Sequence, residues 1–234
     1  MSNLLSSRAL RRGVSLAVVA GALLAPIAQR AVADSPASPQ FGPVIEDYSR
    51  YEGQQKCKPK PKKGTLAFSE LLRTTYPDTT WIGISRACNI GGTSEHKEGR
   101  ALDWSRDATD RAERRSVREL LDWLFAADKH GNENAMVRRL GIMYIIWNRR
   151  IWSTWDQGWD VYCVQKKRKC KDPDSKSMVH PHTDHVHISL GWTGAKMKTS
   201  YWDPALSFEG PPPPGVDPSP SPTPSPSASP PGPD

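Results

Sequence analysis

Five of the six histidines lie in or beside two short segments, and this clustering constrains the fold more than any other feature of the sequence. One histidine lies in residues 94–103, and four lie in residues 180–187. The five are His96, His180, His182, His185 and His187. Histidines that merely fill a core do not gather in this way, so we expect the two segments to contribute to one site.

The spacing within each segment favours extended chain. Side chains two positions apart in a strand share one face, so His185 and His187 can point into one site while Val186 packs behind them. The same alternation places Asp103 on the face opposite Leu102.

A zinc (Zn2+) site fits this set of residues. A catalytic zinc takes about three nitrogen or oxygen ligands and leaves one position open. His96, Asp103 and one histidine of the second segment supply such a set, and Gly99 fits a tight turn between the first two. A zinc that only stabilises the fold is the main alternative, and an exposed polar loop at 180–187 is a weaker one.

The N-terminus predicts export. Three arginines precede an apolar run at residues 14–25, and the small-residue site Ala-Val-Ala ends at residue 33. We therefore expect a signal peptide at 1–33 and a secreted or cell-wall protein without a membrane segment after cleavage, although an N-terminal membrane anchor is the alternative. Loss of four arginines and no acidic residue lowers the formal charge from +7 to +3, too weakly basic to predict nucleic-acid binding.

Four cysteines remain after export, and an even number in an exported chain favours two disulfides. Of the three pairings we favour Cys163 with Cys170 and Cys57 with Cys88. A site of four thiolates around zinc is the competing interpretation, but no Cys-x-x-Cys spacing supports it.

Composition divides the rest of the chain. Residues 34–55 resemble a linker, residues 56–209 have the size of one domain, and residues 210–234 form a Pro/Ser-rich tail that we expect to be disordered. Proline makes up 12 of the 24 residues from 211 to 234, which leaves too little apolar surface to fold.

Within the domain, apolar spacing predicts helices at 65–75 and 133–140, and strands at 81–85 and 142–147. A further helix follows Asp110, with Glu113 as its capping partner and one apolar face. That face comprises Val117, Leu120, Leu121, Leu124 and Phe125. Helices mixed with short strands, without regular alternation, predict an α+β fold with a small antiparallel sheet covered by helices on one side.

The two histidine segments also resemble a known family. Residues 94–103 match Ser-x-His-x-x-Gly-x-Ala-x-Asp and residues 185–187 match His-x-His, the zinc motifs of the D-alanyl-D-alanine metallopeptidase and hedgehog fold, including murein endopeptidases. The body of the chain is also similar to an uncharacterised family of exported actinobacterial proteins. The resemblance implies zinc ligands at His96, Asp103 and His187.

The resemblance also suggests catalytic roles. Carboxypeptidases of this group carry a glutamate three residues before the last ligand, where this chain has Asp184, so Asp184 is the first candidate for the general base and His185 the second. Arg86 occupies a position where family members bind substrate or stabilise the transition state, with a structural ion pair as the alternative. Ser94 and His182 are further candidates for substrate contact, although Ser94 would also suit a turn.

Tryptophans could line a substrate-binding surface. Trp147 and Trp152 flank an apolar strand and are expected in the core, whereas Trp155 and Trp159 are candidates for binding sugar or peptide. Together these features predict a secreted zinc metallopeptidase acting on peptidoglycan stem peptides or cross-bridges. The alternative is a non-catalytic, zinc-stabilised module that binds the wall or a protein. The sequence determines neither the bond cleaved, nor endo or exo action, nor the oligomeric state.

Overall fold

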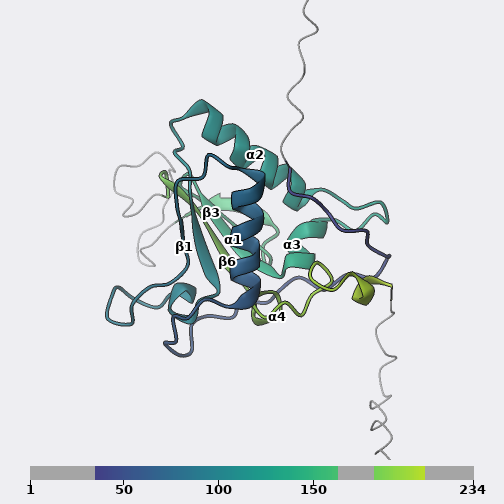
Figure 1. The fold of residues 1–234 in the computed structure, drawn as a ribbon, viewed down its shortest axis with the longest axis horizontal. Helices are drawn as coiled ribbons and strands as arrows, with labels where there is room; N and C mark the ends of the chain where they lie inside the picture. Colours follow the sequence, from purple (N-terminus) through teal and green to yellow (C-terminus); the bar gives the residue numbers. More distant parts are fainter. Residues whose placement is uncertain (1–34, 163–181, 209–234) are drawn as a thin grey trace, which may run out of the picture. The chain divides into compact units, whose positions relative to one another are not determined.

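In the computed structural model, which describes residues 35–162 and 182–208, six strands form an antiparallel sheet in the order β1-β2-β6-β3-β4-β5 (Figure 1). The strands are β1 (Ile82–Gly83), β2 (Ala101–Ser105), β3 (Ile142–Trp147), β4 (Arg150–Ser153), β5 (Gly158–Val161) and β6 (His185–Leu190). The helices are α1 (Lys63–Thr75), α2 (Arg111–Phe125), α3 (Ala135–Leu140) and α4 (Trp192–Ala195), with 3-10 helices η1 (Glu95–Glu98) and η2 (Pro204–Ser207). These elements confirm the α+β class and the antiparallel sheet.

Side-chain alternation gives the sheet two different faces. Leu102 and Trp104 of β2 lie opposite Ile188 and Val186 of β6, and all four are completely buried. This face packs against α1, α2 and α3, whose buried apolar residues join the same core. Figure 1 shows α1 lying against the strands. The other face carries Asp103 and His187, so helices cover the face that does not hold the predicted ligands.

The helix α2 begins largely as its sequence predicts. Asp110 accepts hydrogen bonds from the backbone N–H groups of Ala112 at 2.8 Å and Glu113 at 2.9 Å. The carboxylate of Glu113 accepts from the N–H of Asp107 rather than from that of Asp110, so the reciprocal half of the capping pair was wrong. The buried face of α2 consists of Ser116, Val117, Leu120 and Leu124.

The other predicted elements are present with small shifts in their ends. The predicted helices at 65–75 and 133–140 correspond to α1 and α3, and the strand at 142–147 is β3. The strand at 81–85 is reduced to β1. The strands β4 and β5 were not predicted, because their exposed and polar residues gave no clear alternation.

Residues 35–55 correct the predicted linker. They form neither helix nor strand, yet Phe41 is only 5% exposed and lies under the guanidinium of Arg139, 4.3 Å from the ring centre. Arg139 is fully buried and donates to the carbonyl groups of Gly42 and Val44 and to Asp128. The prediction was wrong because the polar composition hid a few well-spaced residues that pack on the domain. We call residues 35–55 the N-terminal strap.

Two predicted regions, the signal peptide at 1–33 and the tail at 210–234, lie outside the described residues. No helix in the described part of the chain is long and apolar enough to cross a membrane.

We predict that Phe41→Ala lowers the free energy of unfolding by about 3–5 kcal/mol, because it leaves a cavity beneath Arg139. Urea unfolding monitored by circular dichroism measures the change. Leu66→Ala is the matched control, since Leu66 is 48% exposed on α1 and its truncation should cost less than about 0.5 kcal/mol. An equal and small effect of both substitutions would contradict a packed strap.

Candidate metal centre

The sheet register brings the predicted ligands together. Asp103 of β2 lies directly opposite His187 of β6, on the face that the helices leave uncovered. His96 reaches the same place from η1, the short turn that precedes β2. Gly99 ends η1 with a φ of 67°, and a Cβ there would lie 2.1 Å from the carbonyl oxygen of Lys60. The predicted tight turn at Gly99 is confirmed, and the neighbouring backbone is the reason that only glycine fits.

Three ligand atoms converge on one point. Oδ1 of Asp103 lies 2.8 Å from Nδ1 of His187 and 3.1 Å from Nε2 of His96, and the two ring nitrogens are 3.2 Å apart. Among the described residues, these three form the one group of His, Cys, Asp or Glu side chains that has metal-binding geometry.

The donor set fits a small divalent cation. Zinc–ligand bonds of about 2.0–2.2 Å at tetrahedral angles place ligand atoms about 3.3–3.6 Å apart. The observed separations of 2.8, 3.1 and 3.2 Å are slightly shorter, so side-chain shifts of a few tenths of an ångström would admit the ion. Two imidazole nitrogens and one carboxylate oxygen are also the ligand types of catalytic zinc sites.

Hydrogen bonds outside the centre orient both rings. Nδ1 of His96 lies 2.8 Å from the carbonyl oxygen of Ile84, which accepts its proton and leaves Nε2 free as a ligand. Nε2 of His187 lies 3.0 Å from the hydroxyl of Ser189, which leaves Nδ1 directed at Asp103. Each ring therefore presents one nitrogen to the centre and holds the other against the protein.

The electrostatics favour the forms that bind a metal. Burial raises the pKa of Asp103, but hydrogen bonds and charge from His187 and His96 outweigh it, so the pKa of this carboxyl lies well below its usual range. Burial lowers the pKa of His187 more than the Asp103 carboxylate raises it. An ionised carboxylate and a neutral imidazole are the protonation states that metal binding requires.

His185 and His182 lie nearer to the centre than Asp184, the first candidate for the general base. The side chain of Asp184 is 81% exposed and its Oδ1 lies 2.8 Å from Nδ1 of His185. Nε2 of His185 faces inward, 3.7 Å from Oδ1 of Asp103. The ring of His182 lies 4.7 Å from that of His185 and 5.8 Å from that of His187. The structure thus brings His185 and His182 to the centre and leaves Asp184 behind His185.

A hydrogen-bonded pair, Tyr144 and Glu95, supports His187 and was missed in the sequence. The ring of Tyr144 stacks on His187 at 5.4 Å with an interplanar angle of 19°, and its hydroxyl donates to Glu95 at 2.6 Å. Burial raises the pKa of Tyr144 well above its usual value, and the negative charge of Glu95 adds to this effect. Tyr144 lay within an apolar run that we interpreted only as core, but strand alternation places it on the same face as His187.

The other polar candidates have different placements. The hydroxyl of Ser94 accepts from the N–H of His96 at 3.3 Å as the cap of η1, which favours the turn role over substrate contact. Arg86 has no hydrogen-bond or ion-pair partner for its guanidinium within the described residues. Burial raises the pKa of Tyr162. The positive charge of Arg86 lowers this pKa, and the negative charge of Asp103 raises it. The backbone N–H of Arg86 donates to the carbonyl oxygen of His96 at 3.4 Å, so Arg86 lies beside a predicted ligand.

The two candidate tryptophans lie on opposite faces of the sheet. Trp155 is 48% exposed, and its ring lies 6.1 Å from that of Tyr144, on the side of the centre. Trp159 pairs with the buried Trp152 and contacts Phe125 of α2 at 6.2 Å. Strand alternation turns Trp159 toward the helices and away from the centre, and its contact with sugar or peptide stays a prediction. The predicted core position of Trp147 and Trp152 is confirmed.

A disulfide fixes the loop between β1 and η1. Cys57 and Cys88 are bonded, as predicted, across 31 residues. The ammonium group of Lys97 also donates to the carbonyl oxygens of Cys88 and Gly91 at 3.0 and 3.1 Å. This loop carries Arg86. The other predicted disulfide, Cys163 with Cys170, and His180 lie outside the described residues.

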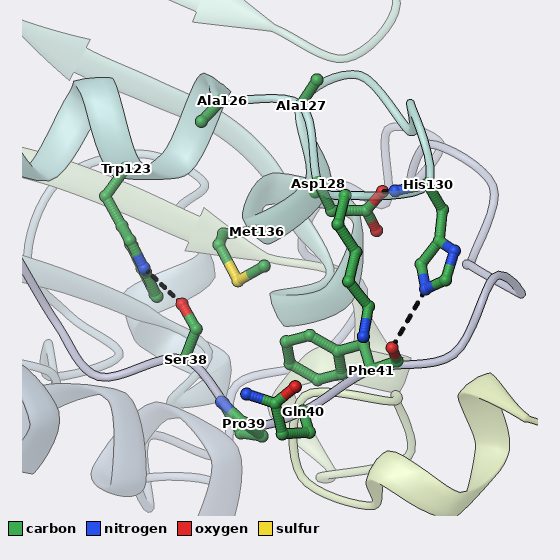
Figure 2. Close-up of a pocket in the computed structure, with 12 residues that line it drawn as sticks. Ser38, Pro39, Gln40, Phe41, Trp123, Ala126, Ala127, Asp128, His130 and Met136 are labelled. Atoms are coloured by element: carbon green, nitrogen blue, oxygen red, sulfur yellow. Dashed lines mark hydrogen bonds between the residues drawn. The ribbon is translucent and has the colours of Figure 1, made fainter.

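Two cavities lie away from the centre and contain none of its ligands. One, of about 260 Å³, lies between the N-terminal strap and the end of α2, where the indole of Trp123 donates to the hydroxyl of Ser38 and His130 faces the carbonyl oxygen of Phe41 (Figure 2). The other, of about 320 Å³, is bordered by Trp159 and Trp147. Neither supplies a set of groups comparable with the centre.

Comparisons with known proteins give one match. Residues 57–169 match the family model described as VldE, C-terminal domain. The match begins at the disulfide cysteine Cys57, includes His96 and Asp103, and ends before β6. No curated protein and no solved structure matches the chain. The relationship to D-alanyl-D-alanine metallopeptidases and hedgehog-type domains stays a prediction.

We predict that replacing Cys57 and Cys88 together by serine lowers the free energy of unfolding by about 3–4 kcal/mol, the entropy of closing a loop of this length. Urea unfolding of the wild type and the double variant, each with and without reductant, measures the change. If reductant still lowers the free energy of unfolding of the double variant, the loss is caused by reduction of a disulfide between Cys163 and Cys170. A double variant as stable as the oxidised wild type would show that Lys97 alone holds the loop.

Proposed function

We propose that this chain is a secreted zinc-dependent peptidase that hydrolyses peptide bonds of bacterial cell-wall peptidoglycan. The observation that carries the proposal is the convergence of His96, Asp103 and His187, whose ligand atoms lie 2.8–3.2 Å apart. The resemblance of their spacing to the D-alanyl-D-alanine metallopeptidase and hedgehog motifs supplies the reaction class. The N-terminal export pattern supports action outside the cell.

In this proposal Nε2 of His96, Oδ1 of Asp103 and Nδ1 of His187 hold the ion. When bound, zinc supplies Lewis acidity, which acidifies water and polarises the scissile carbonyl group. The carbonyl oxygen of Ile84 fixes the tautomer of His96, and the hydroxyl of Ser189 can accept the proton of Nε2 of His187, which leaves Nδ1 for the ion. The burial of His96 and His187 keeps bulk water from competing with these hydrogen bonds.

We assign the general base to His185 and an orienting role to Asp184. Nε2 of His185 faces the centre, whereas the Asp184 carboxylate contacts the opposite nitrogen, Nδ1, at 2.8 Å. His185 takes a proton from the attacking water at Nε2 and donates it to the leaving amine. Asp184 holds Nδ1 protonated and stabilises the imidazolium that forms, as the carboxylate of a catalytic triad does.

Arg86 supplies positive charge to the reaction. The guanidinium has no ion-pair partner among the described residues, and the backbone of Arg86 is hydrogen-bonded to that of the predicted ligand His96 at 3.4 Å. An unpaired cation in that position binds a substrate carboxylate or the developing negative charge on the carbonyl oxygen.

A wall-binding or protein-binding module that uses zinc only for stability is the second candidate. A structural site is normally closed by a fourth protein ligand, and His185 is the nearest group that could serve. Among the described residues, however, His185 falls outside the set whose ligand atoms all lie within 4.8 Å of one another. Three ligands without a fourth among the described residues favour the peptidase.

We predict that the purified mature protein binds one zinc per chain and releases peptide fragments from peptidoglycan sacculi only when zinc is present. His96→Ala, Asp103→Asn and His187→Ala should each weaken zinc binding by more than about 100-fold, since each removes a ligand that contacts the ion. Calorimetry measures affinity and mass spectrometry identifies the fragments. His130→Ala is the control, because His130 lies beside the strap. Full activity after chelation would overturn the proposal.

We predict different effects for the two members of the His185–Asp184 pair. His185→Ala should lower kcat by about 100- to 10,000-fold with zinc retained, because it removes the base. Asp184→Asn should lower kcat less and leave zinc affinity unchanged. Steady-state kinetics with zinc analysis measures both. A larger loss of kcat for Asp184→Asn than for His185→Ala would return the base to Asp184.

A further inference from the structure

We propose that Trp81 and Trp155 bind a peptide chain on opposite sides of the His96–Asp103–His187 centre, so that the substrate is cleaved at an internal bond. This inference rests on the proposed function and specifies the substrate of the same site. It concerns which residues hold the chain on either side of the scissile bond, and therefore whether cleavage is endo or exo.

Trp81 lies on one side of the centre, at the edge strand of the sheet. Its carbonyl oxygen accepts from the N–H of Ser105 at 3.1 Å, which places it beside the face that carries Asp103. The indole leans over Gly83, where an added Cβ would lie 3.6 Å from the Trp81 ring and 4.0 Å from Cβ of Asp103. The ring lies 6.0 Å from that of His185 and the residue is 44% exposed.

Trp155 lies on the other side, just beyond β4. Its ring lies 6.1 Å from that of Tyr144, which in turn stacks on His187 at 5.4 Å. Tyr51 of the N-terminal strap packs edge-on against Trp155 at 5.4 Å. Trp155 and Tyr51 are 48% and 63% exposed, far more than any apolar residue of the core. An aromatic row therefore leads from His187 to the surface.

The two tryptophans are separated by the width of several strands. The order β1-β2-β6-β3 puts three strand spacings between Trp81 and Tyr144, or about 14 Å at about 4.8 Å each. An extended peptide covers about 3.3–3.6 Å per residue, so about four residues are needed to pass from Trp81 to Tyr144, beyond which Trp155 lies. A substrate that ends one residue beyond the scissile bond would leave one tryptophan without a partner. The geometry therefore favours a chain that continues in both directions.

The charges around the centre suit a peptide better than a neutral glycan. Arg86 offers a cation without an ion-pair partner among the described residues, and Asp184 offers a carboxylate that is 81% exposed. A cross-linked stem peptide carries carboxylates and amines that match both signs, while its apolar side chains can pack on the exposed indoles.

The test compares two soluble fragments of peptidoglycan: a cross-linked stem-peptide dimer and synthetic halves that extend on only one side of the cleaved bond. For the dimer, Trp81→Ala and Trp155→Ala should each lower kcat/KM by about 3- to 10-fold, the loss of one aromatic packing contact. Each half-substrate should respond to only one of the two substitutions. Trp81→Phe and Trp155→Phe should restore most of the loss. Trp159→Ala is the matched control, because Trp159 is also partly exposed but faces the helices.

A binding measurement separates this inference from the proposed function. Calorimetry with the dimer and chelated protein should show weaker binding for both alanine variants, even if the wild type cleaves nothing. In that case the proposed hydrolysis is contradicted, but binding of the peptide on both sides of the centre is supported. Wild-type behaviour of both variants, loss on the same half-substrate for both, or no binding and no cleavage by the wild type would each overturn the inference.

Discussion

The pairing of β2 with β6 places Asp103 opposite His187 and Trp104 opposite Val186, and the rest of the structure depends on this register. A shift of one residue would move every side chain of one strand to the other face. Asp103 would then face the helices, and Leu102 and Trp104 would face solvent. The apolar residues that form the core therefore also fix the ligand positions, and no separate interaction is needed to bring together two segments 84 residues apart.

The uncovered face of the sheet depends on polar contacts rather than on helices. Ser189 and the Ile84 carbonyl group fix the two histidine rings, and the Glu95–Tyr144 pair supports His187 from one side. The loop after β1 is held by the disulfide and by Lys97. Both histidine ligands thus rest on groups outside the centre, and such support holds a centre close to its working geometry.

The sequence predicted the parts of this structure that depend on local periodicity. Alternation at His185–Val186–His187 and around Asp103, the apolar face of α2 and the Gly99 turn all follow from spacing along a single segment. The strap could not be predicted in this way, because Phe41 is buried by Arg139 from a distant helix. The direction of Trp159 depends on its register with β4, and the position of Asp184 depends on the side chain of His185. These are tertiary relations that composition does not record.

The domain is held together by interactions that do not involve the proposed metal centre. The described domain has a continuous apolar core, a disulfide and a strap held by the buried Arg139. On the face that the helices leave uncovered, a carboxylate and two histidines are gathered, and the two histidines hold the pKa of Asp103 well below its usual range although burial opposes its charge. The two histidines thus compensate the burial of the Asp103 carboxylate without a metal, and this is why we assign the proposed zinc to binding and chemistry rather than to structure.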